Sequence, residues 1–385
     1  MTVRIAVAVL TVGVVLGGAS AAAAQSGATP TKATKAPKPA RTDTSLAARF
    51  QRDSSQAKKL AKLPHDSSKI AAFYSETAPL AITLTANIKR LRDDKDANAP
   101  YRAATLSYVD DGKTVTVPAR VRTRGIWRLK TCEFPPLRVN FTSEDAKKTV
   151  FKGTDNPKLV GYCRDDDQGE QYVLQEFQLY RIYRLLTPAS HAVRLVRITY
   201  VDSASGKPRT TRYGFFSEDP DAMAARLSGK IMKVTGAGPA DVEAYPSALV
   251  GVFTYMIGNT DFAISALHNA EVVARSNGEI WPVVYDFDFS GAVNARYATP
   301  DPRLHIATVR DRTYRGYCVP VEEYSKVFAL FNQKKDAIYA LYHDDIGRLL
   351  RKSVIDETLR YFDDFYKTIN DPRAAKNQII DECKK

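Results

Sequence analysis

The stretch Trp281–Gly291 (WPVVYDFDFSG) constrains the fold most, because aromatic and acidic residues alternate along it. In a strand, successive side chains point to opposite faces, so three aromatic rings would lie on one face and Asp286 and Asp288 on the other. Neighbouring carboxylates repel each other unless a cation, a basic partner or water neutralises them. Hard cations such as Mg²⁺ prefer these oxygens. The stretch therefore predicts either a cation site or an edge strand with a solvated acidic face.

The start of the chain indicates export. Arg4 is the only charged residue in positions 1–24, and small residues at positions 20–24 suit signal peptidase, so residues 1–24 are predicted to be a signal peptide. An uncleaved membrane anchor is the alternative, because the uncharged run is nearly long enough to span a bilayer. Residues 25–44 are rich in Thr, Ala, Pro and Lys and predict a disordered linker. We expect a periplasmic or extracellular protein with no integral membrane span after cleavage.

The four cysteines, Cys132, Cys163, Cys318 and Cys383, include no C-x-x-C pair, which argues against a zinc site. In an exported protein an even number of cysteines favours disulfides, although sequence alone leaves three connectivities. We favour Cys132–Cys163 because this pair is local, and Cys318–Cys383 then ties down the C-terminus. Buried free thiols are the alternative.

The net charge of +13 favours acidic partners such as envelope polymers, phosphates or an acidic protein. Nucleic acid is not expected, because there is no basic helix and no aromatic RNA-binding motif. The chain also has no G-x-S-x-G elbow, Walker loop or G-x-G-x-x-G motif. These absences argue against the commonest hydrolases, P-loop proteins and dinucleotide-binding proteins.

Hydrophobic periodicity predicts an α+β fold. Helices are expected at 45–63, 171–186, 218–227 and 245–257 and from 321 onward, and strands at 80–88, 101–124 (a hairpin), 135–141, 191–201, 211–216 and 270–274. Gly236–Pro239 is the best boundary signal in the folded part. It divides a β-rich part, residues 45–235, from a mainly helical part, residues 236–385.

Six polar residues fall within about 30 positions, from the end of helix 245–257 to the acidic stretch. They are Asn259, Asp261, His268, Asn269, Asp286 and Asp288. A compact hairpin can bring these groups together, which favours a functional site over a solvated edge. Taken alone, His268 is more typical of a hydrogen-bonded loop residue than of a metal ligand.

Three further features leave alternatives open. Arg120, Arg122 and Arg124 share a strand parity beside a glycine, so they either grip phosphate oxygens or form a solvated basic face. Glu176 lies in the middle of the helix 171–186. It is either a surface carboxylate or the partner of a basic residue in a cleft. The basic run at 310–318 either caps an anionic ligand or is solvated.

Several short motifs occur in an order that resembles a known family. Arg124–Gly125 and the strand Leu137–Phe141 resemble its R-G-x-S element and basic strand, and Tyr213–Asp221 resembles its G-x-Y-x-L-x-E segment. Asn259–Asp261 with Asn269 resembles its N-x-D…N loop, and Tyr285–Gly291 its W-D-x-D stretch. The order of these motifs is similar to that of the CotH family of spore-coat-protein kinases, atypical relatives of protein kinases.

The resemblance implies a two-lobed atypical kinase-like fold, with a mostly antiparallel β N-lobe and a mostly helical C-lobe that carries the acidic site. Asp261, with Asn259 beside it, would orient or deprotonate the acceptor hydroxyl. Asn269 and Asp286 would hold Mg²⁺ or Mn²⁺, and Asp288 would be a second ligand or a support.

By the same resemblance, Arg124 and Arg138 would contact the phosphates of ATP, Lys233 is a further phosphate candidate, and Glu176 would orient a basic residue. The implied function is an exported kinase that transfers phosphate from Mg-ATP to a hydroxyl of an acceptor protein, possibly an acidic one. Two alternatives remain: an inactive kinase-fold protein that binds an envelope component, and a metal-dependent phosphotransferase or hydrolase acting on another phosphorylated ligand.

Overall fold

The structure is a computed structural model that describes residues 70–96, 98–154 and 156–385. The predicted signal peptide, the linker 25–44 and the helix at 45–63 lie outside the described residues. The described residues belong to a single compact unit. No helix within these described ranges has both the length and the apolar character needed to cross a membrane.

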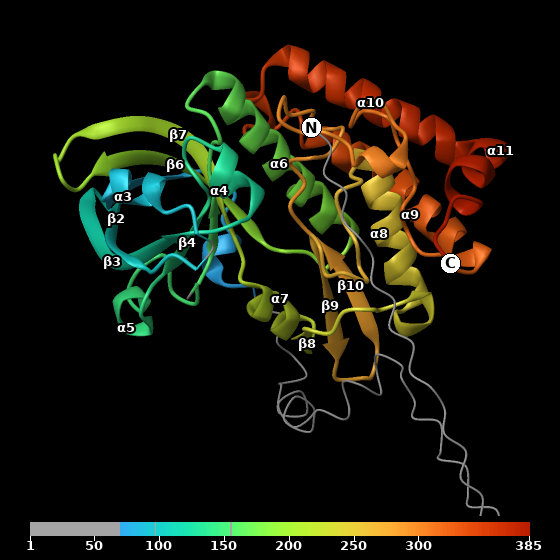
Figure 1. Cartoon of the computed structure of the whole chain (residues 1–385), viewed down its shortest axis with the longest axis horizontal. Coiled ribbons are helices and arrows are strands. Elements are labelled where there is room, and N and C mark those ends of the chain that lie inside the picture. Colours follow the sequence, from blue (N-terminus) through green and yellow to red (C-terminus); the bar gives the residue numbers. More distant parts are fainter. Residues whose placement is uncertain (1–69, 97, 155) are drawn as a thin grey trace, which may run out of the picture. The chain divides into compact units, whose positions relative to one another are not determined.

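Seven strands form a closed barrel in the order β1-β2-β3-β4-β5-β7-β6 (Figure 1). The strands are β1 (Leu80–Ala86), β2 (Arg102–Asp110), β3 (Lys113–Thr123), β4 (Leu137–Asn140), β5 (Lys158–Val160), β6 (Val193–Asp202) and β7 (Pro208–Ser217). Alternate residues of the strands fill the barrel, such as Leu84 and Val121, which are fully buried. The predicted hairpin at 101–124 is confirmed as β2 and β3, and its turn places Asp111 and Gly112 at positive φ.

The prediction of a two-lobed kinase-like fold with a mostly antiparallel β N-lobe is wrong. The barrel is mixed and closed, because β1 pairs in parallel with β6, with Leu80 opposite Val196. Alternation predicts that a segment is a strand, but it does not predict which distant strand will be its neighbour. The coarser expectation of an α+β fold is confirmed, because a helical region follows the barrel.

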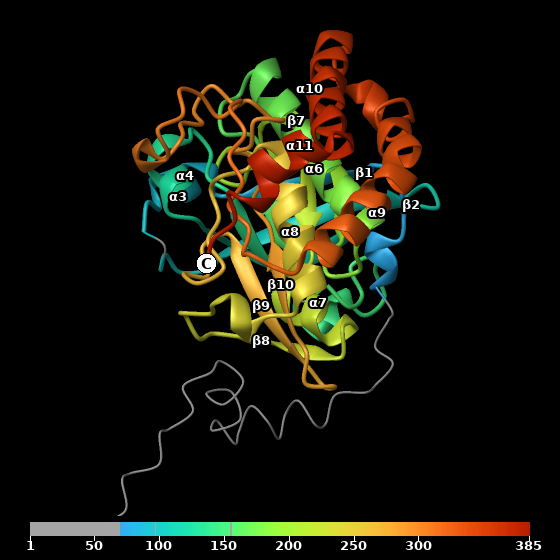
Figure 2. The same cartoon turned by 90° about the vertical axis from the view of Figure 1, so that its right-hand side faces the viewer.

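A second sheet has three strands in the order β10-β9-β8, and Figure 2 shows it beneath α8. Its strands are β8 (Gly229–Met232), β9 (Ala270–Arg275) and β10 (Ile280–Val284). The strand predicted for the acidic stretch ends at Val284, because Asp286 has a φ of 63° and its N–H donates to Tyr180 Oη at 2.9 Å. Phe287 is consequently buried in the core, whereas Phe289 packs edge-on against Trp127.

The α-helices are α3 (Ile88–Asp93), α4 (Trp127–Thr131), α5 (Ser143–Ala146), α6 (Asp167–Leu186), α7 (Pro220–Arg226), α8 (Ala244–Ile257), α9 (Val321–Ala340), α10 (Lys352–Asn370) and α11 (Pro372–Ala375). Shorter helical turns are η1 (Ala72–Tyr74), η2 (Pro239–Asp241), η3 (Pro302–Leu304), η4 (Gly347–Leu349) and the π-helical turn η5 (Lys376–Ile380). Helix α8 ends at Gly258, which takes the left-handed conformation (φ 66°) expected of its C-cap.

Helix α6 joins the barrel to the helical region, and Figure 1 shows it between the barrel strands and α8. On one side Tyr180 packs against Phe215 of β7, with ring centroids 5.5 Å apart. On the other side the Gln175 amide donates to Ala292 O at 3.1 Å and to Thr358 at 3.3 Å. A helix covered on both sides carries its central residues into the interior, and Glu176 is accordingly only 1% exposed.

Both predicted disulfides, Cys132–Cys163 and Cys318–Cys383, are present. The first joins the end of α4 to the segment that leads into α6, and it closes a loop with a sequence separation of 31 residues.

Replacing Cys132 and Cys163 together with Ala is expected to lower the free energy of unfolding by about 3–4 kcal/mol, since a loop of this length restricts the unfolded chain. Urea unfolding of the oxidised proteins measures this difference. Reducing the wild-type protein should give a loss at least as large, because reduction opens both disulfides. An unchanged unfolding midpoint in the double variant would show that the first disulfide has no stabilising role.

Candidate functional site

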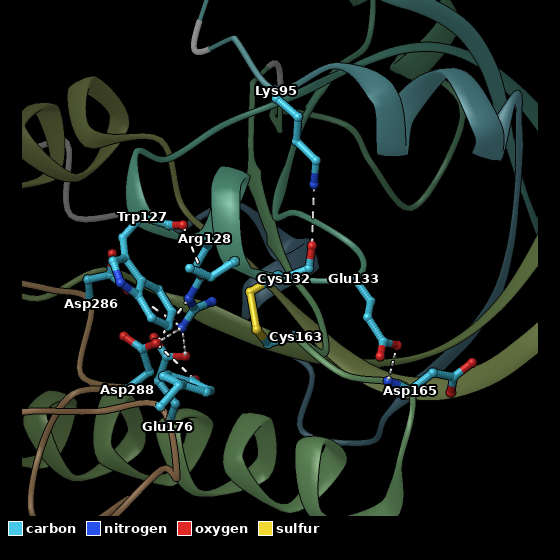
Figure 3. Close-up of a disulfide and its surroundings, with 12 residues drawn as sticks. Lys95, Trp127, Arg128, Cys132, Glu133, Cys163, Asp165, Glu176, Asp286 and Asp288 are labelled. Carbon is cyan, nitrogen blue, oxygen red and sulfur yellow. Dashed lines mark hydrogen bonds and ion pairs between the residues drawn. A yellow bond between two sulfur atoms is a disulfide. The ribbon is translucent and has the colours of Figure 1, made fainter.

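Three carboxylates, two buried and one (Asp286) half-buried, form a cluster at the junction of α6 and the segment after β10. Glu176, Asp286 and Asp288 each offer an oxygen within 4.8 Å of the others. The guanidinium of Arg128 lies among them in Figure 3. Its Nε donates to Asp288 Oδ2 at 3.0 Å, and its Nη2 lies 3.3 Å from Glu176 Oε2 and 3.9 Å from Asp286 Oδ1. Tyr297 Oη also donates to Asp288 Oδ2, at 2.9 Å.

Helix α4 holds Arg128 in this position. It is a short helix that begins after Gly125, whose φ of 94° lets the chain turn, and ends at the disulfide-bonded Cys132. Figure 3 shows that disulfide close to Arg128. The Trp127 ring packs against Phe289 and Tyr297, with both centroid distances at 5.2 Å. The disulfide and the aromatic contacts together fix α4 over the cluster.

Burial and mutual repulsion make the three carboxylates titrate differently. Burial raises the pKa of Glu176, and Asp288 and Asp286 raise it further against the effect of Arg128. Burial likewise raises the pKa of Asp288. Burial opposes ionisation of Asp286 too, but Arg128, Arg124 and Lys158 outweigh it and lower its pKa. Asp286 is therefore the most acidic member of the cluster, whereas burial and mutual repulsion disfavour ionisation of the other two.

The raised pKa of Glu176 predicts a pH-dependent stability. Glu176 binds its proton more tightly in the folded than in the unfolded protein, so protonation stabilises the folded state. This contribution is complete below the ordinary pKa of 4.5 and is lost as the pH rises towards the raised pKa. In metal-free buffer, this effect should lower the free energy of unfolding of the wild-type protein by up to about 1.4 kcal/mol per pH unit between pH 5 and 7. Glu176→Gln is expected to remove this decline. Urea unfolding at several pH values measures the decline. Exposed Glu322→Gln is the control, and an equal slope in both variants would contradict the assignment.

Lys158 is a buried lysine on the barrel side of the cluster. Its ammonium lies 4.2 Å from the centroid of the Tyr285 ring, and no hydrogen bond or ion pair joins it to another described residue. Burial lowers its pKa to about 8, with Arg124 and Arg138 acting in the same direction and Glu271 and Asp286 opposing them. Lys158 is therefore still mostly protonated at neutral pH, and its positive charge attracts the carboxylate of Asp286.

Asp261 lies at the start of the polar loop between α8 and β9. Its Oδ1 is 2.7 Å from His268 Nε2, and its Oδ2 accepts a hydrogen bond from the Asn269 amide at 3.0 Å. Leu267 and Asn269 both have positive φ, 52° and 45°. A left-handed conformation is costly for residues other than glycine and is found disproportionately at functional sites. The loop is therefore shaped to hold the carboxylate of Asp261 in one orientation.

A cleft of about 500 Å³ joins these groups. Five of the residues predicted from sequence line it: Arg124, Asp261, Asn269, Asp286 and Asp288. Its other lining residues include Arg128, Tyr285 and His268. A cluster of acids, a hydrogen-bonded Asp–His pair and basic side chains thus share one cavity. Such a combination is typical of sites that bind metals and phosphates.

The remaining predicted residues lie elsewhere. Glu176 belongs to the acidic cluster but does not line the cleft, and buried Asn259 accepts a hydrogen bond from the N–H of Asp261 at 3.0 Å. The guanidinium of Arg138 donates to Asp219 at 3.0 Å and does not line the cleft. Lys233 is exposed just after β8 and does not line it either.

Sequence reasoning missed Arg128, Lys158 and Tyr297. Arg128 belongs to the same Arg- and Gly-containing segment as Arg124, but nothing in that segment indicates which arginine meets the acids. Lys158 did carry a signal, because a lysine beside Leu159 and Val160 is unusual for a short buried strand. For Tyr297, which lies in an irregular segment, we find no signal.

The carboxylates fit a hard divalent cation. Their oxygens are the ligand type that Mg²⁺ and Mn²⁺ prefer, and Glu176 Oε1 is buried without a hydrogen-bond partner among the described residues. A buried carboxylate oxygen without a partner is energetically unfavourable, and a cation would supply that partner. No protein-family model matches the chain, and no curated protein is significantly similar to it.

Proposed function

We propose that the protein is an exported, Mg²⁺-dependent phosphotransferase that moves the terminal phosphate of ATP to a hydroxyl of an acceptor protein. One observation carries this proposal: a single cleft holds two carboxylates of the acidic cluster, a hydrogen-bonded Asp–His pair and basic side chains. Phosphoryl transfer needs these groups, because it depends on positioning and on neutralising charge. The two disulfides support export, since such bonds persist in oxidising compartments.

Asp286, Asp288 and Glu176 would hold the Mg²⁺ or Mn²⁺, and the metal supplies charge neutralisation to the phosphates when it is bound. Asn269, predicted as a ligand from sequence, lines the cleft and donates a hydrogen bond to Asp261 Oδ2 at 3.0 Å. Arg124 lines the cleft, and its donors would bind phosphate oxygens by charge-assisted hydrogen bonds. Lys158 does not line the cleft and would act through its electrostatic attraction to Asp286. Among the residues implied by the family resemblance, Arg138 and Lys233 have no place in this arrangement.

Asp261 would be the general base. It would accept the proton of the acceptor hydroxyl while the hydroxyl oxygen forms a bond to the terminal phosphorus of ATP, and the bond from that phosphorus to ADP breaks. His268 and Asn269 each contact one oxygen of Asp261 and orient it. Both contacts come from the same short loop, so the carboxylate is positioned before any substrate arrives.

An inactive binding protein is the second candidate, and the position of Arg128 favours it. The guanidinium already neutralises part of the cluster's charge and approaches all three carboxylates within 4 Å. A cation placed among the same oxygens would have to compete with this charge. If Arg128 keeps a cation from binding these carboxylates, the protein binds an anionic envelope component through its basic surface and transfers no phosphate.

Thermal unfolding with and without Mg-ATP tests the proposal. A ligand that binds only the folded state raises its stability by about 2.7 kcal/mol at a concentration near 100 times its Kd, which is a shift of several degrees. We expect that shift with Mg²⁺ or Mn²⁺ and ATP together and not with ATP and EDTA. Mass spectrometry should then find phosphate on the protein or on an added acceptor. Absence of a shift with either metal would exclude a nucleotide site, and a shift without transfer would favour the inactive binding protein.

A further inference from the structure

A second pocket adjoins the cleft at the candidate base. This pocket of about 310 Å³ is also lined by Asp261, His268 and Phe289, so these residues form the wall between the two cavities. The side chains of Asp261 and His268 are 39% and 56% exposed, which means that groups in either cavity can reach them. If ATP occupies the cleft beside the acidic cluster, the second pocket is the adjacent space from which an acceptor hydroxyl can approach Asp261.

The basic run at 310–318 supplies this pocket with its cation. Two of its arginines have structural partners: Arg310 donates to Gly291 O at 3.1 Å, and Arg312 donates to Met256 O at 3.1 Å near the end of α8. Arg315 differs from them. It lines the second pocket, and its Nε is buried without a hydrogen-bond partner in the described part of the chain.

Asp261, Asp301 and Arg303 line the pocket with Arg315, and the two acids attract its charge without forming an ion pair with it. Asp301 is bound by Arg303, whose Nε lies 3.0 Å from each of its oxygens. Asp261 is engaged by His268 and Asn269. Neither carboxylate lies within ion-pair distance of Arg315. Burial lowers the pKa of Arg315, with Arg303 acting in the same direction, and the attraction of Asp301 and Asp261 does not fully offset it.

The second disulfide brings a further positive charge close to Arg315. Cys383 is bonded to Cys318, and the backbone of Lys384 pairs with the same segment, with Lys384 N donating to Gly316 O at 2.9 Å. Arg315 lies close enough to Lys384 to lower its pKa, after the larger effect of burial. Arg315 and Lys384 therefore form a positively charged edge beside the pocket that contains the candidate base.

We propose that this pocket is the acceptor subsite and that it selects a protein segment in which a carboxylate lies near the accepting hydroxyl. The inference rests on the proposed function. Arg315 would bind the carboxylate of a neighbouring Asp or Glu by a charge-assisted hydrogen bond, which its buried Nε lacks in the free protein. That contact places the acceptor hydroxyl at Asp261, the residue common to both cavities. Lys384 adds longer-range attraction and would favour acidic over basic segments.

Fluorescence anisotropy with two labelled peptides tests the subsite. Both peptides contain a central Ser, flanked by Glu residues in one and by Lys residues in the other. We expect the wild-type protein to bind the Glu peptide at least about tenfold more tightly, the size of effect expected from one charge-assisted hydrogen bond. Arg315→Gln should lose most of this preference. Arg90→Gln, which changes an exposed arginine on α3, should keep it.

Equal binding of the two peptides, or an unchanged preference in Arg315→Gln, would overturn the subsite. Displacement of the Glu peptide by excess inorganic phosphate as readily as by unlabelled peptide would also overturn it, because the pocket would then be a small-anion site. The proposed function is tested separately by the Mg-ATP thermal shift. A missing shift with the peptide preference intact would refute phosphoryl transfer and leave the acidic docking site standing.

Discussion

Replacing Asp286 with Asn is expected to abolish the stabilisation of the protein by Mg-ATP. Asp286 is the one member of the cluster whose pKa is lowered, because Arg128, Arg124 and Lys158 outweigh the effect of burial. It is therefore negatively charged at neutral pH, whereas the pKa values of Glu176 and Asp288 are raised by burial. Removing that charge takes away the carboxylate best prepared to bind a divalent cation. Thermal unfolding with Mg²⁺ and ATP measures the loss, and the expected result is a shift of several degrees in the wild type and none in the variant.

Asp110→Asn provides a matched control, since the same chemical change is made at an exposed turn of the barrel far from the cluster. It should keep the wild-type shift. Asp286→Asn also removes a charge that Arg128 partly neutralises, so its stability without ligand must be measured alongside. A folded Asp286→Asn protein with a shift equal to that of the wild type would refute the assignment of Asp286 to the metal.

Replacing Asp261 with Asn is expected to reduce phosphoryl transfer by about 10²–10⁴-fold, the usual contribution of a general base. Asn has nearly the same shape and keeps an oxygen for hydrogen bonding, but it cannot accept the proton of the acceptor hydroxyl. The acidic cluster does not include Asp261, so the Mg-ATP shift should remain. The rate of phosphate incorporation into the Glu peptide is the measurement.

His268→Gln separates base chemistry from positioning. Its ring nitrogen contacts Asp261 Oδ1 at 2.7 Å, but Asn269 holds the other oxygen. Loss of one of two orienting contacts should lower the rate by about tenfold, equivalent to one hydrogen bond. A His268→Gln loss as large as that of Asp261→Asn would indicate that the histidine, and not the aspartate, accepts the proton.

Local pattern predicted much of the secondary structure but not the architecture. The hairpin of β2 and β3 and the end of α8 at Gly258 follow from alternation, turn chemistry and a C-cap glycine. The parallel pairing of β1 with β6 closes the barrel, and it joins segments that share no sequence signal. The expected kinase-like fold was wrong for this reason, since pairing between distant strands is a property of the whole chain.

Most of the site residues that were predicted lie close together in sequence, and Arg124 and Glu176 are the exceptions. Asp261, Asn269, Asp286 and Asp288 all come from the helix-to-hairpin region, and they line one cleft. Arg128 meets Asp288 across 160 positions of sequence. Its role depends on α4, on the first disulfide and on the packing of Trp127, none of which marks Arg128 in the sequence. The departure of Asp286 from strand geometry was equally hidden, because a φ of 63° is unusual for aspartate.

Calorimetric titration of the wild-type protein with ATP, in Mg²⁺ and again in EDTA, tests the central claim most directly. If the buried carboxylates hold a divalent cation and the basic wall of the cleft binds phosphate, ATP should bind with about one site per chain in Mg²⁺ or Mn²⁺ and at least tenfold more weakly in EDTA. If ATP does not bind in the presence of either Mg²⁺ or Mn²⁺, or binds equally well with and without a metal, the claim that this cleft is a metal-dependent nucleotide site is contradicted.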